Sequence, residues 1–287
     1  MPLKWQLSEG TMLKFKRNFK LTIDDTKEEL TFMPPLRIVF ECSKGIYGSQ
    51  GNMNLKIYNL TRSNATRFAK DPTDQKILNV TLEIGYQDDL QIVFKGFVYR
   101  GFVSKEGVDT AVNLQVIDGG SGLNDVESFV SATVGTKEQA FKTIVNAMPG
   151  VSIGKIAQQE PTVRAIVLCG NAVDCLKEQI DPEQNWFIDN GKLYVLGKND
   201  VLSGYVPVVS PETGLENSPE RENYLVNFST RLNPALRVGG LCKLISTTAE
   251  YLNGVYKIQQ IVIRGDNYGQ EWGQLVTGIY GAQYKEL

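Results

Sequence analysis

Carboxylates are the leading candidates for acid–base chemistry in this chain, because its 287 residues include no histidine. That absence removes the commonest general base and excludes serine–histidine and cysteine–histidine nucleophile systems. Paired carboxylates can hydrolyse a glycosidic bond that they flank. Two acidic clusters occur, namely Asp118, Asp125 and Glu127 at a glycine-rich segment and Glu212, Glu216, Glu220 and Glu222 in a predicted loop. Both patterns are typical of solvated loop carboxylates, and we expect no catalysis from them.

Other site signals are equally weak. The glycine-rich stretch from Asp118 to Gly122 lacks the spacing and the Lys-Ser/Thr pair of a phosphate-binding loop, so it predicts a hinge. The four cysteines are Cys42, Cys169, Cys175 and Cys242. They are not spaced as a zinc site, and without histidine we predict no metal and no cofactor. Trp186 and Phe187 could stack on a ligand, but an aromatic hairpin beside two helices is more often core.

Bulk properties narrow the class of protein. The length suits two or three domains, and 42% hydrophobic residues can bury sizeable cores. The net charge is -2 and the pI is near 5.5, with no basic block for binding phosphates, although a DNA conduit that does not bind strongly stays possible. The polar segment from Met1 to Gly10 predicts no signal peptide, and no apolar run reaches the roughly 20 residues of a membrane span.

The first 125 residues show the alternation of β-strands. Apolar residues alternate with polar ones over 36–42, 53–57, 80–86, 90–103 and 109–118, which predicts five strands. Between them, Thr61 to Lys70 predicts a short helix with Thr61 as its N-cap, which would plug one end of a barrel or cross between strands. The Gly119–Gly122 stretch marks the first domain boundary.

Residues 126–201 change to an α+β pattern. Thr136 followed by Gln139 is a capping box, and the helix that it opens should end at Pro149-Gly150. A strand over 163–168, a helix over 171–180 and a hairpin over 185–196 follow. The Asn190-Gly191 pair supplies the positive φ angles that a two-residue hairpin turn needs.

Residues 202–287 return to β structure. A loop over 202–221 is followed by predicted strands at 224–230, 241–246, 254–264 and 271–281. We therefore predict a mainly β protein with two β-barrel domains, residues 1–125 and 202–287, flanking a small α+β domain at 126–201.

The order of these elements, and the C-terminal third above all, resembles the baseplate or tail hub proteins of tailed bacteriophages, the tail protein D-like family of contractile tails. The motifs that carry the resemblance are Ser210–Leu215, Ser218–Arg221, Leu232–Gly240, Gly254–Ile258, Gly265-Asp266 and Trp272, with Leu36–Phe40 and Leu55–Leu60 in the first β region. Each motif is short, and their order covers nearly the whole chain.

The resemblance implies a function in assembly. Hub proteins of this family form homotrimers in which each subunit gives two β domains similar to tail-tube subunits, so three chains build a ring with six-fold-like symmetry. Such a ring meets the tail tube at one end and the central spike at the other, contacts further baseplate and tape-measure proteins, and passes DNA through a polar lumen. The implied location is the baseplate of a virion assembled in the host cytoplasm.

The residues that match the family motifs would then serve turns and interfaces. They are Gly214, Pro219, Asn233, Pro234, Gly239, Gly240, Gly265, Asp266 and Trp272. Asn-Pro followed by Gly-Gly predicts a tight turn between strands, and Gly265-Asp266-Asn267 predicts a turn opposite Trp272, which should anchor a barrel end.

Three alternatives stay open. A virion-associated peptidoglycan hydrolase would need two carboxylates about 5–9.5 Å apart across a cleft. The spike base of an injection machine would usually add a long β-helix, for which we expect no room after the last strand. A tail-tube or distal-tail subunit would need one barrel, and the α+β segment would be surplus.

Overall fold

The computed structural model describes residues 16–25, 27–74, 76–119, 128–159, 164–202 and 204–280, with the backbone of Lys285–Glu286. In this part of the chain the protein is mainly β, and its sheets are mostly antiparallel. None of its helices is both long and apolar enough to cross a bilayer. The predicted mainly β class is therefore confirmed. The boundary glycines Gly120 and Gly122, and the acids Asp125 and Glu127, lie outside the described residues.

The first β region contains the five predicted strands. Alternation of buried and exposed side chains explains them, and it also explains a strand that our sequence reading missed, in which Phe19, Leu21 and Ile23 are buried. Thr61 caps the predicted helix by accepting a hydrogen bond from the Asn64 amide. The elements are β1 (Arg17–Asp24), β2 (Glu29–Phe32), β3 (Ile38–Gly45), β4 (Ser49–Gln50), β5 (Asn52–Tyr58), α1 (Arg62–Phe68), β6 (Asn79–Tyr86), β7 (Asp89–Glu106) and β8 (Asp109–Asp118).

The described part of the middle region contains two helices and five strands, of which β9 and β10 were not predicted. Thr136 caps its first helix by accepting from the Gln139 amide, while the Gln139 side chain accepts from the Gly135 amide, one residue before the position that a capping box predicts. Both Asn190 and Gly191 have positive φ in the hairpin turn, as expected. The elements are β9 (Phe129–Val134), α2 (Lys137–Asn146), β10 (Ser152–Ile156), β11 (Ile166–Asn171), α3 (Ala172–Gln179), β12 (Gln184–Asp189) and β13 (Lys192–Gly197).

The C-terminal region adds short strands and one long hairpin. The predicted loop over 202–221 contains two short strands that sequence patterns did not show. The elements are β14 (Asp200–Val201), β15 (Val208–Val209), β16 (Glu220–Glu222), β17 (Leu225–Arg231), β18 (Leu241–Leu244), the 3₁₀ turn η2 (Glu250–Leu252), β19 (Gly254–Asp266), β20 (Trp272–Tyr280) and β21 (Lys285–Glu286).

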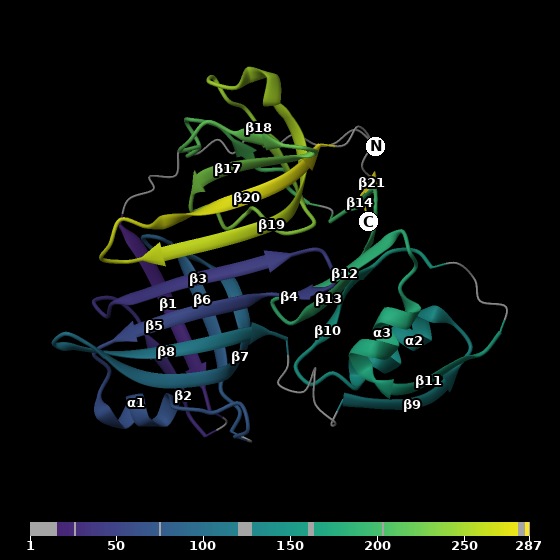
Figure 1. Ribbon diagram of the computed structural model, residues 1–287, viewed down its shortest axis with the longest axis horizontal. Coiled ribbons are helices and arrows are strands. Elements are labelled where there is room, and N and C mark those ends of the chain that lie inside the picture. The colour runs from purple at the N-terminus through teal and green to yellow at the C-terminus, as the bar shows by residue number, and fades with distance from the viewer. Residues whose placement is uncertain are drawn as a thin grey trace.

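The two β regions form one continuous sheet. Its strand order is β16-β17-β20-β19-β3-β5-β8-β7-β6-β1-β2, with β18 and β15 attached beside the first half of β19. Seven residues of β19, Gln260–Asp266, pair with β3, so a strand of the last third continues the sheet of the first (Figure 1). In this view β1 and β6 pass behind β3 and β5, so the sheet curls around its own core.

The expectation of two closed barrels is corrected by this pairing. The short strands β2 and β16 end the sheet and do not pair with each other, so the described strands close no barrel. The physical reason is the length of β19. Its first half pairs with β18 and its second half extends past the C-terminal region to reach β3. Because β3 and β19 pair with each other, the two β regions belong to one open sheet and do not close separately.

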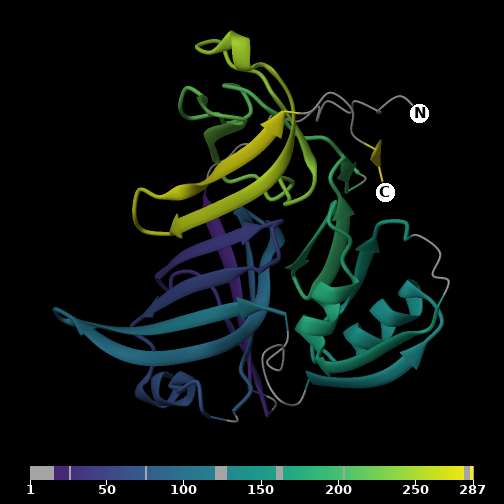
Figure 2. The same cartoon turned by 45° about the vertical axis from the view of Figure 1, so that its right-hand side comes forward.

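The middle region keeps its own core and contacts the sheet through one hairpin. Helices α2 and α3 pack against the two-stranded ribbon β9–β11 and share a core with β12 and β13. This region lies to one side of the large sheet in both views (Figure 2). The strand β12 pairs with β4, and Phe187 and Leu196 of the hairpin belong to the core of the large sheet.

Candidate functional site

The candidate acids do not assemble an active site among the described residues. Asp118 is fully buried and its carboxylate accepts the amides of Asn190 and Gly191 at 2.7 and 2.8 Å. The four glutamates from Glu212 to Glu222 are exposed, and Glu212 accepts from the Ser210 hydroxyl at 2.6 Å. No group of three or more metal-ligating side chains occurs in the described part of the chain. The acids there occupy a structural contact and a solvated loop.

The other chemical candidates are also structural. Burial raises the pKa of Cys42 and of Cys242 to about 12, so neither thiol is ionised at neutral pH. Phe187 stacks on Tyr194 with ring centroids 5.2 Å apart inside the core, which confirms the core interpretation of this aromatic hairpin. Ser152 and Lys155 have a Ser-x-x-Lys spacing that our sequence reading overlooked. Both are exposed on β10, whose register with β13 is irregular between Ile153 and Ile156, and the Ser152 hydroxyl donates to the Gly191 carbonyl at 3.3 Å.

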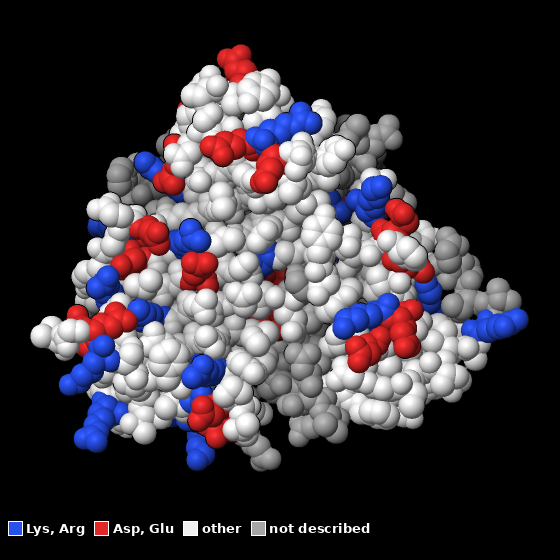
Figure 3. Space-filling view, in the orientation of Figure 1, with Lys and Arg blue, Asp and Glu red and all other residues white. Residues whose placement is uncertain are grey.

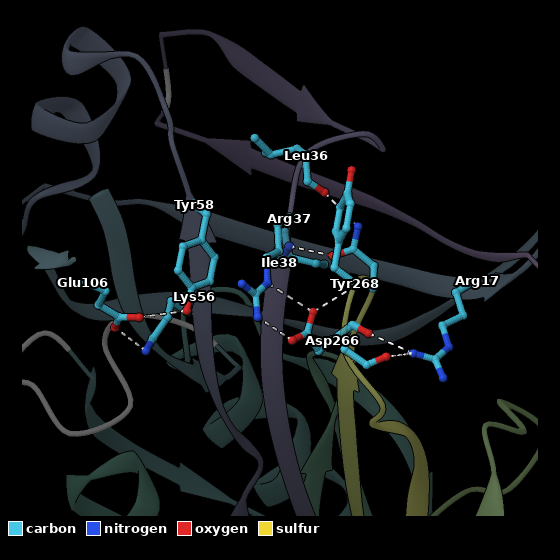
Figure 4. Close-up of polar contacts among 11 residues, drawn as sticks. Arg17, Leu36, Arg37, Ile38, Lys56, Tyr58, Glu106, Asp266 and Tyr268 are labelled. Carbon is cyan, nitrogen blue, oxygen red and sulfur yellow. Dashed lines mark hydrogen bonds and ion pairs between the residues drawn. The ribbon is translucent and has the colours of Figure 1, made fainter. Parts of the chain in front are cut away.

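The motif around Asp266 forms a turn that joins the two β regions. The end of β19 and its following residues, 266–270, contact the start of β3, and we call them the clasp turn (Figure 4). Asn267 accepts from the Ile38 amide at 2.8 Å and donates to the Leu36 carbonyl at 2.9 Å. The Tyr268 hydroxyl donates to the Pro35 carbonyl at 2.7 Å. The side chains of the turn therefore bond to main-chain atoms of the segment that leads into β3.

Two arginines complete the clasp turn. Arg37 donates to the Asp266 carboxylate at 2.8 Å. Arg17, at the start of β1, donates to the carbonyls of Asp266 and Gly269 at 3.1 and 2.6 Å. Burial raises the pKa of Asp266, but hydrogen bonds from Arg37 and from the amides of Tyr268 and Gly269 outweigh it and hold the pKa below its usual value. The carboxylate is therefore charged and bound at neutral pH.

Gly265 and Trp272 pack beneath this turn. They are paired residues of β19 and β20, so the predicted turn begins after Gly265 rather than at it. Trp272 is buried and meets the edge of Phe40 with centroids 5.7 Å apart. A Cβ atom on Gly265 would lie 2.4 Å from Phe40 Cζ. Only glycine leaves room for a ring from the first β region at this point.

The Asn233–Gly240 motif forms two successive turns. The Asn233 side chain accepts from the Ala235 amide at 3.1 Å, and the Gly240 amide donates to the Arg237 carbonyl at 3.1 Å. The Asn233 carbonyl also accepts from Gln274 on β20. Gly239 has φ +78°, and a Cβ there would lie 2.9 Å from Leu196 and 3.0 Å from Phe187. The second turn therefore touches the hairpin of the middle region.

The remaining motif residues line a loop beside β17. Gly214 has φ +115°, and its carbonyl accepts both the Arg231 amide and the Thr230 hydroxyl. Pro219 is buried just before β16, and Pro234 is half-buried in the first of the two turns. All nine motif residues thus lie in the C-terminal region. The structure brings Gly265, Asp266 and Trp272 together, and Asn233, Pro234, Gly239 and Gly240 form a separate group.

A buried charge cluster lies between the large sheet and the middle region, and the sequence did not predict that its residues come together. Lys44 of β3 forms an ion pair with Asp189, lies 4.0 Å from Asp118, and donates to the Asn190 side chain at 2.9 Å. Burial raises the pKa of Asp118, against the opposing effect of Lys44 and of the two turn amides. The Asn-Gly turn was visible in the sequence, but nothing there linked it to Asp118.

A row of mostly polar residues crosses the outer face of the continuous sheet over seven strands, although the same face also exposes Phe102 and Leu275. The row runs through paired residues from β7 to β17, and every member except the half-buried glycine is exposed. The row is Arg100, Gln115, Asn54, Glu41, Arg264, Gly273 and Arg231.

Two cations on this face lie directly beside carboxylates. Arg264 and Glu41 are 3.1 Å apart, and Lys56 contacts Glu106 at 2.6 Å. Figure 3 shows charges of both signs side by side on the face that it presents. The opposed charges of these pairs reduce the net field over the sheet.

Comparison with known proteins identifies a family for this chain and solved structures with a similar fold. The family model "Baseplate hub gp41" matches residues 18–265, whereas no curated protein matches the sequence. Among solved structures, a tail protein from Neisseria meningitidis is similar with a TM-score of 0.63 at 10% identity, covering 91% of this chain and 96% of that one.

Two further structures share the fold. A 43 kDa tail protein of prophage MuSo2 from Shewanella oneidensis has a TM-score of 0.60 at 10% identity, covering 91% and 96% of the two chains. The E. coli c3393 protein, a component of the type VI secretion system, has a TM-score of 0.59 at 10% identity, covering 92% and 78%. These likenesses show the fold, and the family model identifies the chain as a member of the baseplate hub gp41 family of phage tail proteins.

Proposed function

We propose that this chain forms a homotrimeric ring that joins the tail tube of a contractile phage tail to its central spike and lets DNA pass. Each chain would contribute two tail-tube-like β units, residues 1–125 and 202–287, with the α+β unit 126–201 between them. Family membership supports the place in the baseplate. The continuous sheet supports the ring, because two β units joined edge to edge present one broad, curved surface.

The polar face of the sheet carries the proposal. A lumen that conducts DNA needs hydrogen-bonding groups that water can solvate, without a field that holds phosphates. The row from Arg100 to Arg231 contains three arginines and one glutamate. Its positive field is limited because Arg264 lies against Glu41, Arg231 lies 4.0 Å from Glu216, and Gln115 and Asn54 separate Arg100 from the other charges. We assign this face to the lumen, and the opposite face to the core that the sheet curls around.

The motif residues would then maintain ring geometry. The clasp turn fixes the angle between the two β units, because Asp266 and its neighbours bind the start of β3 and β1 at once. Gly239 sets the distance between the C-terminal unit and the middle hairpin, Gly240 closes its turn on Arg237, and Gly214 and Pro219 shape the loop beside β17. None of these roles requires chemistry, and we assign the chain a structural function without catalysis.

The partners follow from this position. We propose contacts with a second and third copy, the tail tube protein, the central spike, and other baseplate and tape-measure proteins, in a virion assembled in the host cytoplasm. DNA would contact the chain only in transit.

The test is the solution mass of the purified protein by light scattering, followed by imaging. A particle of three times 31.9 kDa with a central opening is expected. A single copy that clears peptidoglycan in a zymogram would instead support the hydrolase alternative, in which exposed acids such as Glu212 and Glu216 would be the first to replace.

A further inference from the structure

The Asn190-Gly191 turn between β12 and β13 has the residue types of a spontaneous modification. Asparagine followed by glycine readily loses ammonia, because glycine leaves the attacking amide unhindered and its backbone mobile. The glycine nitrogen loses its proton and bonds to Cγ of the asparagine, the Cγ–Nδ2 bond breaks, and ammonia leaves a cyclic imide. Water then opens the imide to aspartate or isoaspartate. The chain has two such pairs, and the other is Asn253-Gly254.

The attacking nitrogen of this turn is bound to a buried carboxylate. The Gly191 amide donates to Asp118 Oδ1 at 2.8 Å, and the Asn190 amide donates to Oδ2 of the same side chain at 2.7 Å. Both Asp118 and Gly191 are buried. A carboxylate is too weak a base to remove an amide proton, and its negative charge opposes the amide anion that the reaction needs. The bond therefore keeps the nitrogen protonated.

The carboxamide of Asn190 is held in a different direction. Its Oδ1 accepts from Lys44 Nζ on β3 at 2.9 Å, whereas the Gly191 amide donates to the last residue of β8. Asn190 has φ +53° and Gly191 has φ +72°, the left-handed values of a tight hairpin turn. The Gly191 carbonyl also accepts the Ser152 amide at 2.9 Å. Closure of the imide would have to rotate this turn against all of these bonds.

The product of the reaction would disrupt the contact between the middle region and the large sheet. A carboxylate at position 190 would join Asp118 and Asp189 around Lys44, so three acids would share one buried cation. A buried charge without a partner is strongly unfavourable. Isoaspartate would also lengthen the main chain of a two-residue turn, and the hairpin of that turn contributes Phe187 to the core of the large sheet.

We propose that Asp118 and Lys44 protect the Asn190-Gly191 turn from losing ammonia, and thereby preserve the junction between the middle region and the large sheet. Such protection would serve a hub in a finished virion, because a chain in an assembled particle is not replaced by new synthesis. That benefit rests on the proposed function, whereas the protection itself depends only on contacts within one chain.

The first test incubates the unmodified chain at alkaline pH, both folded and unfolded in urea. Peptide mapping by mass spectrometry distinguishes asparagine, aspartate and isoaspartate at position 190. We expect Asn190 to convert more slowly in the folded chain by about tenfold or more, because conversion requires local opening of the turn. Equal rates in the two states would overturn the proposal.

Two alanine variants separate protection by Asp118 from general loosening of the hairpin. Asp118→Ala removes the acceptor of both turn amides. Its matched control is Asp200→Ala, which removes the carboxylate that accepts the Gly197 amide at 2.8 Å at the other end of the hairpin. We expect Asp118→Ala to raise the conversion rate of Asn190 by about tenfold or more, and Asp200→Ala to leave it unchanged.

Asn253 provides an internal control in every sample. Its side chain is bound to the main chain of Ser246 in the C-terminal region, away from the cluster, so its rate should be the same in both variants and the unmodified chain. Equal increases at Asn190 in the two variants, or an increase in Asp118→Ala that Asn253 shares, would overturn the proposal. The solution mass that tests the ring is measured separately, so either proposal can fail without the other.

Discussion

Substitution of Gly265 by alanine tests whether the Phe40–Trp272 contact joins the two β regions. The new Cβ would lie 2.4 Å from Phe40 Cζ and 2.5 Å from Cε1. Carbon atoms in contact lie about 3.5–4.0 Å apart, so the ring must retreat by about 1 Å. Phe40 is 2% exposed and already meets Trp272, so it has no space to enter. Overpacking of this kind costs about 1–3 kcal/mol.

The assay is urea denaturation followed by tryptophan fluorescence, with Gly135→Ala as the control. A Cβ on Gly135 meets only the Gln139 side chain at 3.6 Å, an ordinary contact, so that variant should unfold like the unmodified chain. Phe40→Leu removes the two ring atoms that clash and costs roughly 1–2 kcal/mol by itself.

The double variant Gly265→Ala with Phe40→Leu makes the reasoning refutable. If the clash is the cause, the two costs are not additive, and the double variant is more stable than their sum predicts by about 1 kcal/mol or more. Additive costs, or a Gly265→Ala chain as stable as the unmodified one, would show that this contact does not determine the packing of β3 on β19.

Three further perturbations test other contacts of the structure. Gly239→Val should disturb the seating of the middle hairpin and reduce ring formation in light scattering, because φ is +78° and Cβ would meet the hairpin core at 2.9 Å; normal assembly would refute that role. Lys44→Ala should cost about 3–5 kcal/mol in thermal unfolding, because it leaves the buried Asp118 and its neighbouring carboxylate without a cation. The pKa of Asp266 is lower in the folded protein than its usual value of about 3.9. The bond from Arg37 therefore stabilises the fold above that pH, and this stabilisation is lost as the pH falls through the folded pKa. Between pH 6 and pH 3, the melting temperature of the unmodified chain should fall further than that of Asp266→Asn.

Local structure was predictable where a single pattern determines it. The strand Asp109–Asp118 was predicted with its observed bounds, because alternation and a polar residue at each end define it. Thr136 and Asn190-Gly191 each act through neighbours in the sequence, so capping and turn rules found them. The short strands β4, β15 and β16 have two or three residues and exist only through their partners, which explains why no pattern showed them.

Long-range pairing was beyond these rules. The contact of β19 with β3 joins residues more than 200 positions apart, and neither strand alone indicates its partner. The same holds for Lys44 and Asp118, whose cluster depends on a turn that follows 70 residues later. The motif around Gly265 was found by resemblance, but its contacts with Phe40 and Arg37 needed the tertiary structure.

The most direct test of the proposed hub is a cryo-electron microscopy reconstruction of the assembled tail at the junction of tube and spike. We expect three copies of this chain around the axis, with the row from Arg100 to Arg231 facing the lumen and the clasp turn of each chain intact. A chain found away from that junction, present in another copy number, or turned so that this face contacts protein would contradict the proposal.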